Sequence, residues 1–446
     1  MAFPDIRKSR RWLSAEEFRF LAILFLVLVL VLAVNINLAR TLPGGEWLFL
    51  RWSGVRAFLA AQAESTREGL KAGRTIPGGA PVILVEQTQP YGTEIAQQTQ
   101  QVAYGRRAFS SEYAYVLNDP FFIVLLYIPL AFIRDFTLVR GIWILLSEVA
   151  LIGTVLLAFN LSEWQPPRWL YVCLLGFGLF SYFSLNALLT GTPAIILAFI
   201  YLCILMALRA FSDEVAGILL ALVAYQWEVG GLFFLFILFF VFANRRWGVL
   251  AGLGMALFVL LVISFMTYPG WGLPYIRAVL SDWIRGGNLN FGSILSNWIP
   301  ESRVPIQGIL SGGLGLILFF EWLASAHAHF RHVVWTAGLS LAATPLIGFA
   351  IFPSNHVVLI FPFILIVALV WERWQRRRVL FTILILLLVL LIPFGLYLRS
   401  VYIYDPLVTD LMSVLPPIAA LIGLYWTRWW VIRSRRTWFD RMGDYR

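Results

Sequence analysis

The chain has 446 residues, of which 60% are hydrophobic and only 13% are charged. Water-soluble domains are about half apolar and about a quarter charged, so this composition excludes a soluble globular protein. It equally excludes a disordered chain, and two cysteines are too few for a disulfide scaffold. We therefore expect a polytopic membrane protein that forms a single integral membrane domain over residues 1–446.

The positive charge is distributed in a way that fits a membrane. The formal net charge is +10, and lysine occurs only at Lys8 and Lys71, so arginine carries nearly all of the positive charge. A basic total can indicate nucleic-acid binding. Most of the arginines, however, lie between apolar segments, where they anchor helix ends and set orientation. We expect membrane lipids as partners and no nucleic acid.

The apolar segments predict an all-α protein with about twelve transmembrane helices, since about 20 apolar residues span the hydrocarbon core. The segments are 18–38, 120–134, 137–159, 168–187, 193–210, 214–243, 247–268, 306–326, 332–352, 356–373, 379–398 and 407–433. The segment 214–243 forms either a single helix or, since it is long enough, two half-helices around Gln226-Trp227-Glu228.

Arginine clusters predict the orientation of the chain. With the N-terminus in the cytoplasm, alternate crossings place Arg134, Arg140 and later arginine clusters on the same side, and the C-terminus follows. The connection 187–193 also falls on the cytoplasmic side. Two large loops, 40–118 and 269–305, are then extracytoplasmic. The basic tail 434–446 is expected to lie on the anionic inner leaflet.

The first loop begins with a predicted interfacial helix. Apolar residues recur in it at three- and four-residue spacing, and Arg51 and Arg56 lie among polar positions where lipid phosphates are in reach. Glu46 begins this helix. It is a candidate catalytic carboxylate, or simply a charge that the helix dipole stabilises.

The end of the same loop carries a second candidate group. Tyr115, Asn118 and Asp119 precede the apolar segment 120–134. Asp119 would bind sugar hydroxyls or act as a base. Alternatively, Asn118-Asp119-Pro120 caps a helix with proline at its first position.

The second loop combines aromatic, amide and arginine side chains, among them Trp283, Arg285 and Asn290. Aromatic planes and amides suit a sugar, and arginine suits a phosphate. An interfacial tryptophan belt has the same composition, and both interpretations stay open.

Polar residues inside or at the ends of spans are costly in lipid and indicate function or buried partners. They include Glu148, Gln226 and Glu228, and the pair Asn355-His356 at the start of the tenth span. His356 is either a helix-end group or an assisting catalytic residue. The three histidines between 327 and 332 lack a thiol or carboxylate nearby to complete a zinc shell, so no metal site is expected.

Four local features together resemble the bacterial membrane glycosyltransferases of family 87. They are Gly44-Gly45-Glu46-Trp47 with the helix that follows; Tyr115 to Pro120 with Tyr127-Ile128-Pro129; Phe183 to Pro193 with Ala216-Gly217 through Gln226; and Thr344-Pro345 with Ser354-Asn355-His356. The chain departs from the family pattern at three places. The family usually has aspartate where Glu46 stands, lysine near Gln226, and glutamine near Thr192.

The resemblance implies a C-type glycosyltransferase fold in the bacterial plasma membrane. It implies an inverting hexosyltransferase that moves a mannose-like hexose or a pentose from a polyprenyl-phosphate donor to a glycan or glycolipid acceptor, without a cofactor or metal. Glu46 is then the first choice for the general base and Asp119 the second, with His356 assisting. The expected substrate- and phosphate-binding residues are Arg51, Arg56, Tyr115, Asn118, Gln226, Arg285, Asn290 and Asn355.

Two other functions fit the same sequence. A lipid or solute transporter or flippase would use Glu148 and Glu228 as coupling-site residues, although only one candidate helix interruption is visible, near Gln226. A polysaccharide polymerase or ligase would share the lipid-linked donor and the large outer loops.

Overall fold

The computed structural model describes residues 15–71, 90–109, 112–286, 290–298, 303–402 and 406–432. Within these ranges the chain is helical and forms no β-strand, apart from an isolated bridge between Asn290 and Ala350. The predicted tail 434–446 and part of the predicted loop 40–118 lie outside the described residues.

The helices follow one another with short connections. In chain order they are α1 (Ala15–Thr41), α2 (Glu46–Lys71), α3 (Thr93–Tyr104), α4 (Phe121–Val124), η1 (Leu125–Tyr127), α5 (Ile128–Ala131), α6 (Phe136–Leu161), α7 (Arg168–Phe180), α8 (Tyr182–Thr190), α9 (Ala194–Arg209), α10 (Asp213–Val223), α11 (Trp227–Ala243), α12 (Trp247–Thr267), α13 (Gly272–Gly286), α14 (Phe291–Trp298), α15 (Arg303–Ser325), α16 (Phe330–Ala343), η3 (Thr344–Leu346), η4 (Pro353–Leu359), α17 (Ile360–Arg373), α18 (Arg378–Tyr402) and α19 (Pro406–Ile432).

Eight helical segments in the described part of the chain are long and apolar enough to cross a membrane. They are Glu16–Thr41, Phe136–Leu161, Arg168–Thr190, Trp247–Thr267, Gln307–Ser325, Pro353–Arg373, Arg378–Ser400 and Val408–Trp429. Three further apolar helices are shorter: Phe121–Ala131, Ala194–Arg209 and Trp227–Ala243. The protein is therefore an all-helical polytopic membrane protein, as the composition predicts.

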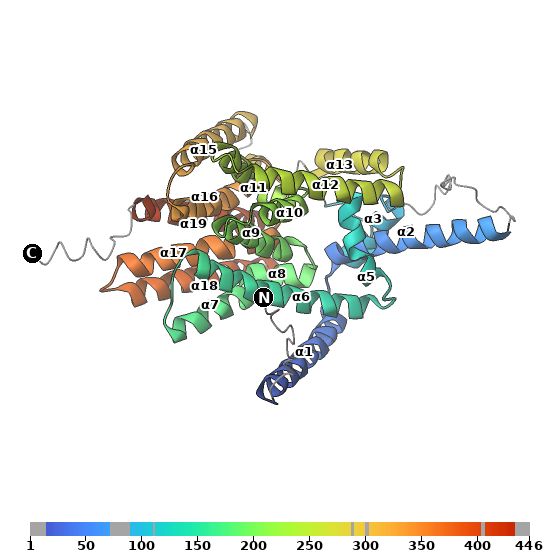
Figure 1. Cartoon of the computed structure of the whole chain (residues 1–446), viewed down its shortest axis with the longest axis horizontal. Helices are drawn as coiled ribbons and strands as arrows, with labels where there is room; N and C mark the ends of the chain where they lie inside the picture. The colour runs from blue at the N-terminus through green and yellow to red at the C-terminus, as the bar shows by residue number, and fades with distance from the viewer. Residues whose placement is uncertain are drawn as a thin grey trace, which may run out of the picture.

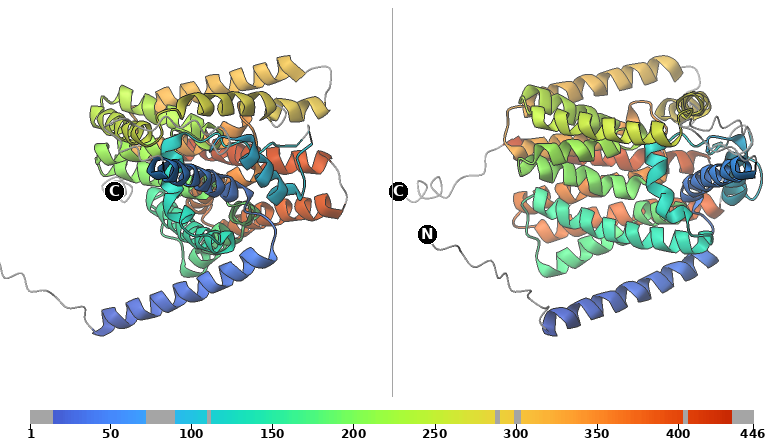
Figure 2. Two further views of the ribbon diagram at one scale, coloured as in Figure 1. Left: turned by 90° about the vertical axis from the view of Figure 1, so that its right-hand side faces the viewer. Right: turned by 45° about the vertical axis from the view of Figure 1, so that its right-hand side comes forward.

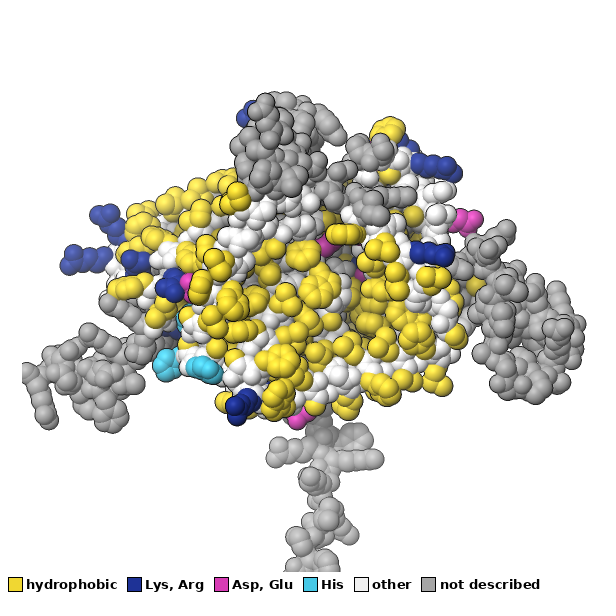
Figure 3. Space-filling view, turned by 90° about the horizontal axis from the view of Figure 1, so that it is seen from above, with side chains coloured by type: hydrophobic (Ala, Val, Ile, Leu, Met, Phe, Trp, Pro, Cys, Tyr) yellow, Lys and Arg dark blue, Asp and Glu magenta, His cyan; other side chains and the backbone are white. Residues whose placement is uncertain are grey.

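The helices form a bundle with an appendage at one end (Figure 1). There α2, α3 and α13 lie beside the ends of the long helices, and α1 slants away from the bundle (Figure 2). Hydrophobic side chains gather over the middle of the face in Figure 3, which fits a surface that contacts lipid. Two apolar clusters fill the interior, one in the main bundle and one between α2, α4 to α6 and Trp271.

Hydrogen bonds show which connections share an end of the bundle. Near the start of α6, Arg140 donates to the carbonyls of Leu42, Pro43 and Leu189 at 2.7, 2.8 and 3.0 Å. The ends of α1 and α8 therefore lie at the same end as Glu46, which we call the Glu46 end. The expectation that Arg140 and the connection 187–193 lie on the side opposite Glu46 is wrong.

The reason for this difference is the segment 120–134. It folds as α4, η1 and α5, which together span only Phe121–Ala131 and pack against α2. The indole of Trp52 donates to the carbonyls of Leu130 and Ile133, both at 3.2 Å. The segment thus covers the Glu46 end of the bundle, and the chain turns back there into α6.

The opposite end is defined by a second set of contacts. Arg209 at the end of α9 donates to Asn160 in the last turn of α6 and to Glu163 just after it. Arg246 before α12 pairs with Asp213 at the start of α10. The predicted segment 214–243 forms two helices, α10 and α11, separated at Ala224–Gln226. The sequence left open a single helix or two half-helices, and the structure has two helices that form a hairpin: Gln226 reaches Asp119 at the Glu46 end, and Arg246 returns to Asp213 at the opposite end.

Close packing of α10 on α12 depends on glycine. A Cβ built on Gly217 would lie 2.1 Å from the carbonyl oxygen of Val249, and one on Gly252 would lie 2.4 Å from the carbonyl oxygen of Glu214. Backbone atoms cannot yield as a flexible side chain does, so only glycine allows this approach.

We predict that Gly217→Ala destabilises the protein by about 1–3 kcal/mol, because an added methyl group overpacks the contact of α10 with α12. The measurement is the apparent Tm of the purified protein in detergent. Gly254→Ala on α12 is the matched control, since a Cβ there meets nothing within 4 Å, and a gain in helix propensity leaves its Tm equal or slightly higher. Equal Tm values for the two variants would contradict the packing argument.

Candidate functional site

A cavity of about 590 Å³ opens at the Glu46 end of the bundle. Its wall is built by α2, the segment before α4, the break between α10 and α11, α13 and the segment before η4. Its polar lining residues are Arg51, Tyr113, Asn118, Thr192, Tyr225, Gln226, Glu228, Tyr275, Asp282, Asn290 and Asn355. Its larger apolar ones are Trp47, Phe122, Trp227, Leu261, Trp271, Trp283, Phe349 and Phe352.

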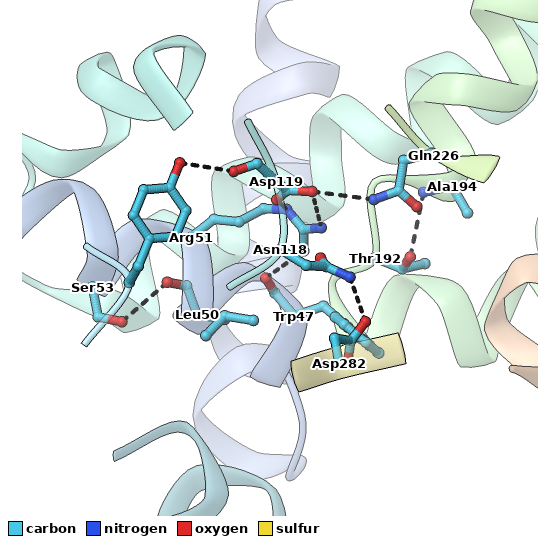
Figure 4. A network of polar contacts seen from close by, with 11 residues as sticks. Trp47, Leu50, Arg51, Ser53, Asn118, Asp119, Thr192, Ala194, Gln226 and Asp282 are labelled. Atoms are coloured by element: carbon cyan, nitrogen blue, oxygen red, sulfur yellow. Dashed lines mark hydrogen bonds and ion pairs between the residues drawn. The ribbon is translucent and has the colours of Figure 1, made fainter. Parts of the chain in front are cut away.

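A buried ion pair forms one side of the cavity. The Nε of Arg51 lies 2.6 Å from Oδ2 of Asp119, its Nη2 donates to Oδ1 at 3.2 Å, and the two side chains are 2% and 1% exposed. Arg51 also donates to the carbonyl of Trp47 at 2.9 Å. Gln226 donates to Oδ1 of Asp119 at 3.2 Å, and Tyr91 donates to its carbonyl at 3.0 Å. Asp119 thereby joins α2, the end of the first loop and the break between α10 and α11 (Figure 4).

Asp282 is a second carboxylate of the cavity and is held in place by two donors. The hydroxyl of Tyr113 and the amide of Asn118 each donate to it at 2.7 Å. Asn118 and Asp282 approach each other from the first loop and from α13 (Figure 4). Burial raises the pKa of Asp282, and the hydrogen bonds from Tyr113 and Asn118 lower it in part. The group is oriented, and both of its oxygens are already engaged.

Glu228 is the third acidic group at the site and differs from the other two. It lies in the first turn of α11, where the helix dipole favours a carboxylate. It lines the cavity, and among the described residues its side chain makes no hydrogen bond or ion pair. Carboxyl oxygens without a partner at a cavity wall can accept a hydrogen bond from a hydroxyl group.

Aromatic rings and amides complete the lining. The ring centroids of Trp47, Tyr113 and Phe352 lie 5.1–5.4 Å apart in pairs, so these rings form one continuous aromatic wall. The cavity amides are those of Asn118, Gln226, Asn290 and Asn355. Aromatic planes contact the apolar faces of a sugar, and amides bind its hydroxyls.

The cavity gathers part of the residue set expected from the sequence. Lining it are Arg51, Asn118, Gln226, Asn290 and Asn355. Asp119 lies behind Arg51 and Gln226 and contacts both. Outside the lining are Glu46, Arg56, Tyr115 and His356. The side chain of Arg285 lies outside the described residues.

Glu46 occupies a separate buried environment. Gly44 and Gly45 precede it with φ of +118° and +87°, a conformation that lets the chain turn sharply from α1 into α2. Its side chain is 8% exposed. Burial raises the pKa of Glu46 to about 7, opposed by a backbone hydrogen bond and by the Arg140 guanidinium.

The other expected residues pack against neighbouring side chains and do not line the cavity. Arg56 lies over the ring of Trp52, at 4.7 Å from its centroid, and donates to the carbonyl of Arg134 at 3.3 Å. Tyr115 stacks edge-on against Trp47, with 5.2 Å between centroids. His356 is 1% exposed and packs against Phe183, and neither ring nitrogen has a hydrogen-bond partner among the described residues.

Asp282 and Tyr113 are among the cavity residues that the sequence did not single out. The periodicity of apolar residues on α13 could have indicated that Asp282 points into the protein. Leu273, Ile276, Leu280 and Trp283 recur at three- and four-residue spacing and are 50–77% exposed. Asp282 is 8% exposed and faces the cavity. The apolar side of α13 is thus the exposed side, and the side that carries Asp282 faces the protein. In the part of the chain that the structure describes, no cluster of three or more His, Cys, Asp or Glu side chains is arranged to hold a metal ion.

No protein-family model, no curated protein and no solved structure matches this chain.

The ion pair at the cavity wall supports a prediction about stability. Asp119→Asn leaves the Arg51 guanidinium buried without a counter-charge, which is expected to cost about 3–5 kcal/mol. The measurement is the denaturation midpoint in detergent. The Arg51→Met/Asp119→Leu double variant should recover much of the loss, whereas Glu163→Gln, which removes an exposed pair with Arg209, should cost under about 1 kcal/mol. A midpoint unchanged by Asp119→Asn would contradict the assigned role.

The environment of Glu46 predicts a pH dependence of stability. Its pKa is about 7 in the folded protein against an ordinary value of 4.5, so between these two pH values the folded state retains a proton that the unfolded state has released. The free energy of unfolding is therefore expected to fall by up to about 3 kcal/mol as pH rises through this window. Above about pH 7 it should level off.

Glu46→Gln removes the titration, so its Tm should vary less between about pH 5 and 8 and should exceed that of the wild type at the upper end. Glu94→Gln, on an exposed position of α3, serves as the control. A Glu46→Gln profile parallel to the wild-type profile would show that Glu46 does not titrate in this range.

Proposed function

We propose that the protein is an inverting glycosyltransferase that moves a sugar from a polyprenyl-phosphate donor to a glycan or glycolipid acceptor. The observation that carries the proposal is the cavity at the Glu46 end. It combines an aromatic wall, four amides, an arginine and an unpaired carboxylate within a membrane protein. Aromatic rings and amides suit a sugar, and an arginine suits the phosphate that links it to a lipid.

The cavity wall supports lateral access for a lipid. Trp283 on α13 is 77% exposed and Leu261 on α12 is 37% exposed, and both line the cavity. They adjoin an apolar surface formed by neighbouring exposed residues such as Phe258 and Leu280. A prenyl chain that lies along this surface would bring its phosphate-linked sugar to the cavity without leaving the membrane.

We place the general base at Glu228 in preference to Glu46, because Glu228 lines the cavity and has free oxygens. In the reaction, the acceptor hydroxyl oxygen attacks the anomeric carbon while its proton passes to the Glu228 carboxylate. The bond from that carbon to the phosphate oxygen breaks, and the electron pair leaves with the polyprenyl phosphate. Attack from the face opposite the leaving group inverts the configuration.

The other cavity residues have supporting roles in this proposal. Asp282, oriented by Tyr113 and Asn118, binds sugar hydroxyls through lone pairs that those two donors leave free. Arg51 lies at the cavity wall, where its charge favours the leaving phosphate. Asp119 holds Arg51 in position. The proposal places the site on the extracytoplasmic face of a bacterial plasma membrane, with both chain termini in the cytoplasm.

A transporter for a lipid or solute is the second candidate, and one observation favours it. The break between α10 and α11 turns a helix N-terminus and polar side chains toward the cavity, and Gly230 within α11 has non-helical dihedral angles of −156° and 33°. Interrupted helices of this kind form substrate sites in secondary transporters.

We predict that Glu228→Gln lowers sugar transfer at least about 100-fold, since positioned general bases contribute about 10²–10⁴ to the rate. The assay uses protein in lipid nanodiscs, polyprenyl-phosphate mannose as donor and a glycolipid extract as acceptor, and it measures release of polyprenyl phosphate. The matched control is Glu214→Gln, an exposed glutamate at the opposite end of the same helical hairpin, and it should keep full activity.

Three other results would decide against this assignment. Loss of transfer in Glu46→Gln with activity retained in Glu228→Gln would move the base to Glu46. Transfer from a nucleotide sugar but not from the polyprenyl donor would overturn the donor class. Solute or lipid movement across proteoliposomes without release of polyprenyl phosphate would favour the transporter.

A further inference from the structure

A second cavity lies between the last three long helices, in the half of the bundle away from the first one. It has a volume of about 290 Å³ and is lined entirely by apolar or aromatic residues of α8, α17, α18 and α19. The lining on α18 runs from Ile385 to Pro393, and the lining on α19 runs from Leu415 to Trp426. We call this the α18–α19 groove.

Prolines lie in both of the helices that give the groove its name. Pro393 lies inside α18, and Pro416 and Pro417 lie inside α19. Proline lacks the N–H of a helical hydrogen bond, and its ring hinders close packing of the preceding turn. Gly423 lets Ile366 of α17 approach α19 closely, since a Cβ at this position would lie 2.6 Å from the Ile366 side chain.

The groove is as long as one leaflet of a bilayer. Trp426 lies eleven residues after Leu415 on α19, which corresponds to about 16 Å along the helix axis at 1.5 Å per residue. Half of the hydrocarbon core of a bilayer is about 15 Å. Leu388, Ile392, Leu415 and Trp426 on its rim are 38–49% exposed, so the groove is open along its side. Its dimensions and lining suit a hydrocarbon chain that enters from the surrounding lipid.

A basic cluster lies at the end of the groove. Trp426 lines the groove, and its carbonyl accepts a hydrogen bond from Arg373 at 3.4 Å. The guanidinium of Arg373 also lies 5.8 Å from the Trp426 ring centroid. Arg376, Arg377 and Arg378 follow directly after α17 and are exposed. Positive charge at the mouth of an apolar groove between membrane helices suits the phosphate of an anionic lipid.

We infer that the α18–α19 groove binds one acyl chain of an anionic phospholipid, whose phosphate lies against the arginines at 373–378. The lipid comes from the leaflet on the side opposite the Glu46 end. Asn355, just before α17, lines the cavity at the Glu46 end, so the other end of α17, where Glu372 pairs with Arg331 and Arg373 follows, lies at the opposite end of the bundle. The site is separate from the catalytic cavity and does not depend on the proposed glycosyltransferase activity. It stabilises the α18–α19 hairpin against the rest of the bundle.

The test measures lipid binding to delipidated wild-type protein. Phosphatidylglycerol is added in detergent, the apparent Tm is recorded against lipid concentration, and bound lipid is counted by native mass spectrometry. We expect one tightly held phosphatidylglycerol and a rise in Tm that saturates, whereas phosphatidylcholine should bind at least about 10-fold more weakly.

Two variants examine the two halves of the site. Ala419→Phe fills the groove from an exposed lining position, and Arg376→Gln/Arg377→Gln removes charge at its mouth; each should weaken phosphatidylglycerol binding at least about 5-fold. The matched controls are Ala251→Phe, on an exposed face of α12, and Arg40→Gln/Arg134→Gln, exposed at the Glu46 end. Both controls should bind as the wild type does.

Other outcomes overturn the inference in distinct ways. Equal affinity for phosphatidylcholine and phosphatidylglycerol would remove the role of the arginines. Unchanged binding in Ala419→Phe would show that the chain lies elsewhere. Displacement of phosphatidylglycerol from this site by polyprenyl phosphate at equal concentration would identify a prenyl lipid as the occupant. None of these results depends on sugar transfer, so the failure of this inference and the failure of the proposed activity are distinguishable.

Discussion

The Arg51–Asp119 ion pair is the interaction on which the architecture of the site depends. Both side chains are almost fully removed from solvent, and a buried charge is tolerated only when its partner and further hydrogen bonds are in place. Through Asp119 the pair connects α2, the end of the first loop and the break between α10 and α11. Asn118, next to Asp119, then reaches Asp282 on α13. Four separate parts of the chain are thereby fixed around one cavity.

The composition determines the class of the protein, but apolar length alone does not determine the path of the chain. The segment 120–134 is as apolar as a crossing, yet it forms short helical pieces that cover the Glu46 end. Its role depends on contacts with α2, such as the hydrogen bonds of Trp52, and a hydropathy pattern does not contain them. The segment 214–243 shows the opposite case, because Gln226 and Glu228 in its middle do indicate the break that the structure has.

The amide residues of the site were easier to predict than its arginines and carboxylates, since Arg51 lines the cavity but Arg56 does not. Asn118, Gln226, Asn290 and Asn355 stand out as polar groups among apolar ones, and all four line the cavity. Glu46 stands out equally, but the Gly44-Gly45 turn directs it toward Arg140 and away from the cavity. Asp282 is one charge on an amphipathic helix, and its direction becomes clear only when the exposed apolar face of α13 is known.

The break at Ala224–Gln226 also has a consequence for where a reaction would take place. α10 begins at the end of the bundle away from Glu46, and its 11 residues rise only about 16 Å before Gln226 reaches Asp119. That is about half of the thickness of the hydrocarbon core. If α10 crosses the membrane from that end, the floor of the cavity would lie below the headgroups. Charges there would interact more strongly than they do in water, and the acceptor of the proposed reaction would need an extended end to reach them.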